Sequence, residues 1–158
     1  MTGVQTCALP ICTFAHLETR PEQEAALSCF RRHLAPAGSL VLALQNPYQW
    51  ALDPAQDEVV FGWEKPGPEI GETTRMSYAV HTDRALQLRH LRLWYDVAAS
   101  GGVLHRTGAA LSQRWTYRPE MELLLEACGF LPEACYGTYD LDSYDADTPL
   151  LLVLATRP

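Results

Sequence analysis

The chain has 158 residues, of which 47% are hydrophobic and 20% charged, with 19 acidic side chains against 12 basic ones and a net charge of -7. This composition predicts one soluble globular domain with a sizeable core. The excess of acid argues against nucleic acid as a partner, because binding to a phosphate backbone depends on clustered Lys and Arg. No apolar run reaches the ~18 residues that a membrane span needs, and no basic signal region opens the chain, so we expect a cytoplasmic protein without a membrane partner.

The first eleven residues, Met-Thr-Gly-Val-Gln-Thr-Cys-Ala-Leu-Pro-Ile, match the codon-by-codon translation of a short-read sequencing adapter. We therefore interpret residues 1–12 as an adapter-derived artefact with its junction codon, and expect the natural reading frame to continue upstream of Thr13. The alternative is a short natural N-terminal strand. The remaining cysteines show no Cys-x-x-Cys spacing, which predicts neither a disulfide framework nor a zinc site: Cys29, Cys128 and Cys135.

Residues 19–35 are predicted to form a helix. Thr19 and Glu22 fit a capping box, and Leu27, Phe30 and Leu34 fall on one face. The short apolar run at residues 39–44 that follows is typical of a buried parallel strand. Helix, tight loop and strand together indicate the second half of a βαβ unit.

The middle of the chain predicts an antiparallel meander. Residues 50–71 hold Pro, Gly and acids and are expected to be irregular. Three strands are expected after them, at residues 74–81, 86–97 and 103–115. The first turn is predicted at Thr82-Asp83, the second at Ser100-Gly101-Gly102, and a bulge near Arg89-His90, where the alternation slips.

The last third returns to mixed structure. A second helix is predicted to begin at Pro119 and to end at Gly129, because Met121, Leu124, Leu125 and Cys128 share one face. Strands are expected at residues 131–139 and 150–156, joined by an acidic turn at residues 140–149.

These pieces occur in a familiar order. They are Thr-Phe-Ala-His-Leu at 13–17, Arg-Arg-His-Leu-Ala-Pro-Ala-Gly at 31–38, Gln-Asn-Pro at 45–47, Trp-Thr-Tyr-Arg-Pro-Glu-Met-Glu at 115–122, Ala-Cys-Gly-Phe at 127–130 and Tyr-Gly-Thr-Tyr-Asp at 136–140. Residues 13–158 resemble the C-terminal portion of a bacterial class I S-adenosylmethionine-dependent methyltransferase. Ala37 departs from the family pattern, which usually has a second glycine there.

The resemblance implies an α/β fold: a partial doubly wound, Rossmann-like sheet that lacks its first four strands, with the meander at about residues 72–116 as an insertion. The family's Gly-rich loop and ribose-binding acid would precede Thr13, and the sequence contains no Gly-x-Gly-x-x-Gly. S-adenosylmethionine is thus the implied cofactor, but we expect this chain to bind it poorly. The edge of the 39–44 strand is also expected to be unpaired.

The implied site lies beyond the carboxyl ends of the strands. Phe14 and His16 would lie beside the cofactor, and the alternative for His16 is a packing role. Candidates for holding a small-molecule acceptor are Asn46, Tyr48, Tyr117, Arg118 and Tyr139, with Tyr136 and Tyr144 as further lining. Asn46 serves equally well to end a strand with an Asx turn, and Arg118 can be a surface residue. The sequence names no catalytic residue.

No metal site is expected. The acidic residues Asp140, Asp142, Asp145 and Asp147 lack the Gly and Glu of an EF-hand, and His81, His90 and His105 show no ligand spacing. The leading hypothesis is a truncated methyltransferase whose parent transfers a methyl group to a small molecule. The alternatives are a non-enzymatic α+β module that binds a small ligand and, with less support, a scaffold domain. The methyl acceptor and the oligomeric state are left open.

Overall fold

The computed structural model describes residues 7–8, 13–50, 57–67, 71–99 and 101–158. The chain divides into two compact units. The first comprises Met1–Leu52 and Gln113–Pro158, and the second comprises Asp53–Ser112. The first unit mixes helices and strands, whereas the described part of the second is a sheet of antiparallel hairpins.

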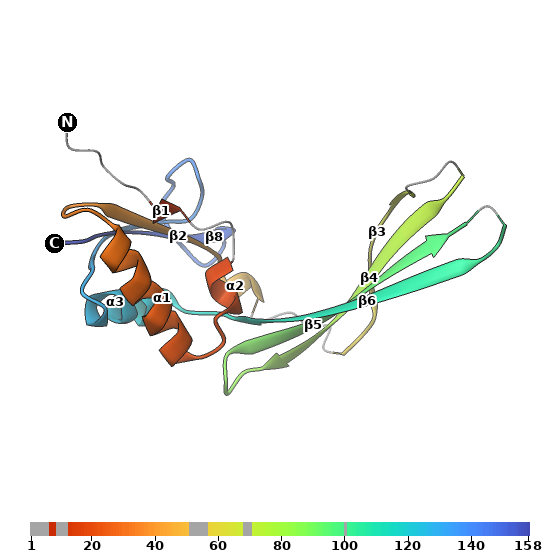
Figure 1. Ribbon diagram of the computed structural model, residues 1–158, viewed down its shortest axis with the longest axis horizontal. Helices are drawn as coiled ribbons and strands as arrows, with labels where there is room; N and C mark the ends of the chain where they lie inside the picture. The colour runs from red at the N-terminus through yellow and green to blue at the C-terminus, as the bar shows by residue number, and fades with distance from the viewer. Residues whose placement is uncertain (1–6, 9–12, 51–56, 68–70, 100) are drawn as a thin grey trace. The chain divides into compact units, whose positions relative to one another are not determined.

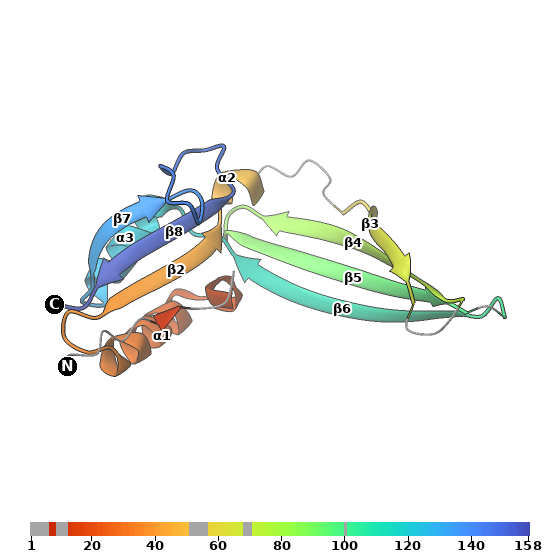
Figure 2. The same ribbon diagram turned by 90° about the horizontal axis from the view of Figure 1, so that it is seen from above.

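A four-stranded sheet in the order β1-β2-β8-β7 forms the centre of the first unit. Its strands are β1 (Cys7–Ala8), β2 (Ser39–Gln45), β7 (Leu131–Tyr136) and β8 (Leu150–Thr156). β1 runs parallel to β2, while β8 runs antiparallel to both of its neighbours (Figure 2). The last strand of the chain therefore lies between β2 and β7.

The edge of β2 is not left unpaired along its whole length, contrary to the expectation from the sequence. Cys7 and Ala8 pair with Leu40 and Val41. An apolar segment can satisfy the exposed N–H and C=O groups of a strand edge whatever its origin. The rest of the segment that we interpret as adapter-derived lies outside the described residues.

Two of the helices, α1 (Arg20–His33) and α3 (Arg118–Ala127), lie on the same side of this sheet (Figure 1). The first unit holds η1 (Thr13–His16), α1 (Arg20–His33), α2 (Pro47–Trp50) and α3 (Arg118–Ala127). The predicted capping box of α1 is confirmed, because the Thr19 hydroxyl accepts from the Glu22 N–H while the Glu22 carboxylate accepts from the Thr19 N–H. The Thr19 hydroxyl also donates to the Glu22 carboxylate at 2.8 Å, and this bond, followed by that from the Thr19 N–H, lowers the pKa of Glu22. α3 ends at Ala127 with Cys128 as its C-cap, and the glycine predicted to terminate it, Gly129, follows in a left-handed conformation with a φ of 80°.

The core lies between the sheet and these helices. Alternate side chains of β2 and β8 face it, which gives each strand one fully covered face. The members with at most 4% exposure include Phe14, Leu27, Leu40, Leu42, Leu44, Met121, Leu125, Phe130, Leu151, Val153 and Ala155. Burying each of the larger side chains stabilises the fold by about 1.5–3 kcal/mol.

The connection from α1 to β2 passes through a left-handed residue. Ala37 has a φ of 60°, and its N–H donates to the Arg157 carbonyl oxygen at 2.9 Å. Arg157 returns a bond from its own N–H to the Gly38 carbonyl. A residue with a Cβ is destabilised by about 1–2 kcal/mol in this conformation, whereas glycine adopts it freely. Position 37, where the resembling family usually has glycine, is therefore one at which glycine is the better residue.

The second unit is a sheet in the order β3-β4-β5-β6. Its strands are β3 (Val60–Pro66), β4 (Thr73–Asp83), β5 (Leu88–Ala98) and β6 (Leu104–Arg114). β4 pairs with both β3 and β5 in antiparallel fashion. The three predicted strands of the meander are therefore present, and the turn at Gly101-Gly102 is confirmed by a left-handed Gly102.

Three details of the predicted meander are wrong. β3 lies within residues 50–71, which were expected to be irregular, because cross-strand pairing with β4 outweighs the weak strand tendency of Gly62 and Pro66. The bulge falls in β3, between Phe61 and Trp63, whereas β4 and β5 pair without interruption past Arg89-His90. The first turn follows Asp83 instead of including Thr82, because the Asp83 carboxylate accepts from two N–H groups of the next residues. Also, β7 ends at Tyr136, short of the expected residue 139.

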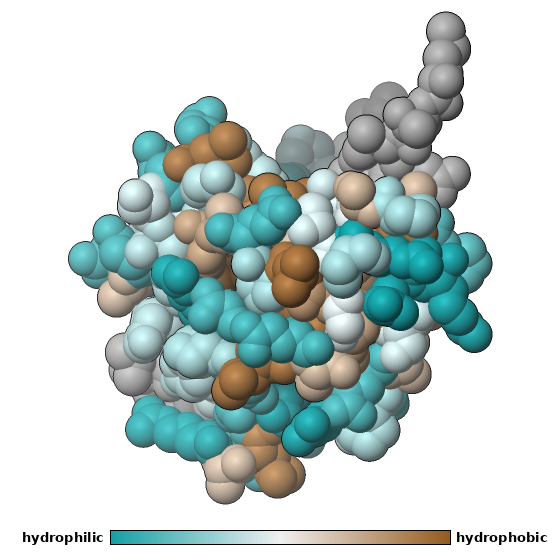
Figure 3. All heavy atoms as spheres, turned by 90° about the vertical axis from the view of Figure 1, so that its left-hand side faces the viewer, coloured by the Kyte–Doolittle hydropathy of each residue, from teal (hydrophilic) through white to brown (hydrophobic). Residues whose placement is uncertain are grey.

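The surface of the first unit is mixed. Its exposed large hydrophobic side chains include Leu123, Leu131, Tyr139 and Leu141. Figure 3 shows one face, on which hydrophobic side chains form small separate groups among hydrophilic ones. None of the helices in the described ranges is long and apolar enough to cross a membrane.

Candidate functional site

Asn46 is the anchor of the site at the carboxyl end of β2. Its side chain is fully buried, with 0% exposure. The amide nitrogen donates to the carbonyl oxygens of Asp145 at 2.8 Å and Thr148 at 2.6 Å. The amide oxygen accepts from the Tyr48 N–H at 3.1 Å, which is the Asx turn that begins α2. Asn46 therefore ties the end of β2 to the loop at residues 145–148.

Tyr144 approaches Asn46 from that loop. Its hydroxyl donates to the Asn46 amide oxygen at 3.2 Å. Burial, with smaller contributions from Tyr48 and Cys135, raises the pKa of Tyr144 to about 12. The hydroxyl is consequently protonated at neutral pH, and its oxygen lone pairs can accept a hydrogen bond. Tyr144 is thus suited to holding a donor group and unsuited to acting as a base.

Two more tyrosines stand beside this pair. The rings of Tyr48 and Tyr117 are tilted by 58° with their centroids 5.5 Å apart, and Tyr48 is 44% exposed. Tyr117 is the N-cap residue of α3. Tyr144 is close enough to both for their charges to affect its pKa. We call Tyr48, Tyr117 and Tyr144 the tyrosine cluster.

Arg118 lies next to the cluster but is already paired. Its Nε atom is 2.7 Å from the Glu122 Oε1 atom one turn along α3, and this bond raises the pKa of the guanidinium. The side chain is 46% exposed, so the pair is weak and solvent-screened. A ligand carboxylate would have to displace Glu122 to take the role predicted for Arg118.

The structure brings together Asn46, Tyr48, Tyr117 and Arg118, all of which the sequence singled out. Tyr139 does not join them: it is 57% exposed, and the described part of the chain gives its side chain no hydrogen bond or ring contact. Tyr144, which the sequence predicted as further lining, contacts Asn46 instead. Tyr144 is the only tyrosine within the predicted 140–149 turn, and bonds to Asn46 hold that turn in place.

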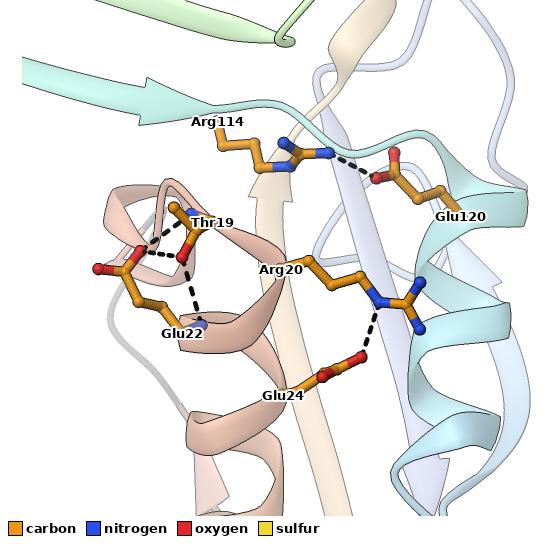
Figure 4. A network of polar contacts seen from close by, with 6 residues as sticks. All are labelled: Thr19, Arg20, Glu22, Glu24, Arg114 and Glu120. Carbon is orange, nitrogen blue, oxygen red and sulfur yellow. Dashed lines mark hydrogen bonds and ion pairs between the residues drawn. The ribbon is translucent and has the colours of Figure 1, made fainter.

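A separate hollow of about 370 Å³ lies between α1 and α3. Its lining residues are Arg20, Gln23, Arg114, Glu120, Leu123 and Leu124. Both arginines are paired with acids, Arg20 with Glu24 at 2.7 Å and Arg114 with Glu120 at 3.0 Å (Figure 4). With its charges balanced inside the protein, this hollow is a weaker candidate for a site than the tyrosine cluster.

No protein-family model and no curated protein matches the sequence. Solved structures do match. An S-adenosylmethionine-dependent methyltransferase from Clostridium acetobutylicum aligns with 96% of this chain at a TM-score of 0.74 and 12% identity. The CcbJ methyltransferase from Streptomyces caelestis aligns with 100% at 0.70 and 18% identity. CalS10, an amino pentose methyltransferase from Micromonospora echinaspora solved with S-adenosylmethionine bound, aligns with 97% at 0.68 and 19% identity.

The fold is methyltransferase-like. At these identities the likeness establishes the fold alone. The chain spans 56%, 64% and 58% of the lengths of these three structures. All three of these structures are methyltransferases, which agrees with the resemblance drawn from the sequence.

The two residues predicted to lie beside the cofactor have different surroundings. Phe14, predicted to lie beside the cofactor, is 2% exposed and packs in the core. His16 is exposed at the end of η1. Of the two predicted cofactor residues, only His16 therefore presents a side chain that a ligand can reach without repacking the core.

Proposed function

We propose that the chain is the acceptor-binding part of an S-adenosylmethionine-dependent methyltransferase that acts on a small molecule, with the amine of a sugar as the preferred acceptor. The observation that carries this proposal is the tyrosine cluster at the carboxyl end of β2. In open α/β sheets, ligands bind at that edge. The amine is suggested by CalS10, an amino pentose methyltransferase, and by KedS8, a sugar N-methyltransferase, whose fold is similar at a TM-score of 0.69.

The side chains at this edge have complementary tasks in the proposal. The tilted rings of Tyr48 and Tyr117 offer apolar walls to a sugar ring, and their negative faces attract the N–H groups of its neutral amine, which keeps the lone pair that takes the methyl group. The Tyr144 oxygen accepts a hydrogen bond from an N–H or O–H of the acceptor. Asn46 holds Tyr144 and the start of α2 in place, which makes it a positioning residue. S-adenosylmethionine supplies the methyl group in enzymes of this kind, and the role of these residues is to orient the acceptor.

We further propose that the chain as printed binds S-adenosylmethionine weakly and is inactive alone. Support comes from the core position of Phe14 and from a sequence without Gly-x-Gly-x-x-Gly. Isothermal calorimetry with S-adenosylmethionine tests this point. We expect no saturable heat at micromolar ligand; saturable micromolar binding contradicts it.

Acceptor binding is tested separately, by titrating amino sugars and neutral sugars against the chain and following tyrosine resonances by NMR. We expect amino sugars to shift the resonances of the tyrosine cluster, and Tyr117→Ala to abolish the shifts. Tyr139→Ala is the matched control, since Tyr139 is an exposed tyrosine outside the cluster. Equal loss in both variants, or shifts confined to other residues, refutes the assignment.

A non-enzymatic module that binds a small ligand is the second candidate. It is favoured because the three tyrosines of the cluster lie together in a chain whose sequence has no Gly-x-Gly-x-x-Gly and whose Phe14 lies in the core. The two functions differ in one property: a methyltransferase acceptor carries a nucleophilic nitrogen or oxygen, whereas a binding module accepts the N-methylated sugar equally well.

A further inference from the structure

We propose that the second unit carries a binding site for a divalent transition-metal ion, formed by His81 of β4 and His90 of β5. The two residues are direct partners in the register of these adjacent strands. Their rings lie 6.3 Å apart between centroids, with an interplanar angle of 19°. β4 and β5 run side by side along their whole length (Figure 1). Sequence spacing hides this pair, because each histidine comes from a different strand.

Each imidazole is held by its Nδ1 atom. His81 Nδ1 is 3.0 Å from the Asp57 Oδ2 atom, and His90 Nδ1 is 2.8 Å from the Ser112 Oγ atom. Asp57 is itself fixed, since its N–H donates to the Val80 carbonyl at 2.8 Å. A neutral imidazole that donates its Nδ1–H to a carboxylate, as His81 does to Asp57, has its Nε2 lone pair available for a metal. His90 offers Nε2 in the same way in the tautomer whose Nδ1–H donates to the Ser112 hydroxyl. A hydrogen bond at the other ring nitrogen usually accompanies a metal-ligating histidine.

The separation of the rings suits a bridging ion. Two Zn–N bonds of about 2.0–2.1 Å, together with the two rings, span roughly 5–6 Å between centroids. Because a bound metal lies in the plane of each imidazole, at least one of the two stacked rings must also turn about its side-chain bonds to bind it. Both histidines line a hollow of about 520 Å³ on the sheet. Within the described ranges, no group of three or more His, Cys, Asp and Glu can hold a metal. The proposed site accordingly has two protein ligands, with its other positions open to water or to the oxygen atoms of a ligand.

The charge of Arg92 helps to distinguish a cation site from an anion site at this hollow. It lines the same hollow, and the described part of the chain shows no hydrogen bond or ion pair to its guanidinium. A cation at the histidines is repelled by Arg92 and attracted by Asp57, whereas an anion is attracted by Arg92 and repelled by Asp57. Variants of these two residues therefore separate a metal site from an anion site.

The test is calorimetric titration of the tag-free chain with Zn²⁺, at a pH where free imidazole is neutral and under a reductant that does not bind metal. We expect one saturable site that His81→Ala and His90→Ala each weaken at least tenfold. Asp57→Asn should weaken Zn²⁺ binding by about 10–100-fold, as does loss of the hydrogen bond to the ring nitrogen of a ligating histidine that does not bind the metal. His105→Ala is the matched control, an exposed histidine of β6 outside the pair, and should leave the affinity unchanged. Arg92→Ala should leave the affinity equal or make it tighter.

Circular dichroism of each variant verifies that the sheet is intact. Wild-type Zn²⁺ affinity in both histidine variants overturns the proposal, because the ion then binds elsewhere, for example at a free cysteine. Absence of saturable binding also overturns it. Saturable binding of inorganic phosphate that Arg92→Ala abolishes, without Zn²⁺ binding, identifies an anion site instead.

Discussion

Replacing Asn46 with Ala removes the link on which the proposed acceptor site depends. The substitution deletes two donated bonds, to the Asp145 and Thr148 carbonyls, and the acceptor used by Tyr48 and Tyr144. Because Asn46 is fully buried, the groups left behind lose their partners in a place where water does not reach without rearrangement.

The size of the effect follows from this inventory. A buried polar group left without a partner costs about 1–3 kcal/mol. The loop at residues 145–148 is largely exposed, so its carbonyls regain water when the loop relaxes, while the Tyr144 hydroxyl remains half-buried. We therefore expect a loss of about 2–4 kcal/mol in the free energy of unfolding.

Urea denaturation followed by circular dichroism measures that loss. Gln49→Ala is the control, because the Gln49 amide also donates to this loop, at 3.0 Å to the Ala146 carbonyl, but from an exposed position. Gln49→Ala should change stability by no more than about 0.5 kcal/mol. Equal effects of the two substitutions would refute the reasoning that burial of Asn46 makes it the anchor of the site.

Three further outcomes follow from individual contacts. Ala37→Gly should stabilise the chain by up to about 1 kcal/mol in urea denaturation, because relief of a left-handed alanine exceeds the added entropy of the unfolded chain; a destabilised variant would show that the Ala37 backbone is unstrained. Thr19→Ala should lower stability by about 1 kcal/mol through loss of the α1 capping box, whereas Thr138→Ala, in a loop, should not change the helical circular dichroism signal. Ultraviolet titration should find one tyrosine that ionises near pH 12, and this transition should be absent in Tyr144→Phe. Because the pKa of Tyr144 is raised from 10.0, its contribution to the free energy of unfolding is complete below pH 10.0 and is lost as the pH rises toward 12. A full set of tyrosines titrating near pH 10 would contradict the burial of that hydroxyl.

Short-range sequence patterns predict most of the secondary structure of the first unit. The capping box at Thr19 and Glu22, the apolar run of β2 and the glycine after α3 each express a rule that operates within a few residues, and each is found in the structure. β3 was missed because Gly62, Glu64, Lys65 and Pro66 have no strand preference of their own. Their conformation comes from pairing with β4, which is a property of the fold and not of the segment.

The candidate site likewise contains residues that local patterns predict and residues whose position depends on contacts distant in sequence. Asn46 and Tyr48 were found because they follow a recognisable strand, and Tyr117 and Arg118 because they precede a recognisable helix. Tyr144 and Tyr139 differ only in how the loop between β7 and β8 folds, and that fold is set by bonds to Asn46, about 100 residues earlier in the sequence. The pairing of His81 with His90 likewise depends on a register that the sequence places wrongly at the preceding turn.

Sequencing the source DNA across the junction at Cys12 tests the methyltransferase proposal most directly. We predict that the natural reading frame replaces residues 1–11 and continues upstream for roughly 90 residues, about three βα units, with a strand, a Gly-rich turn and a following acidic residue. A start codon just before Thr13, with no such segment upstream, would contradict the proposal and leave the small-ligand-binding module as the better account of the tyrosine cluster.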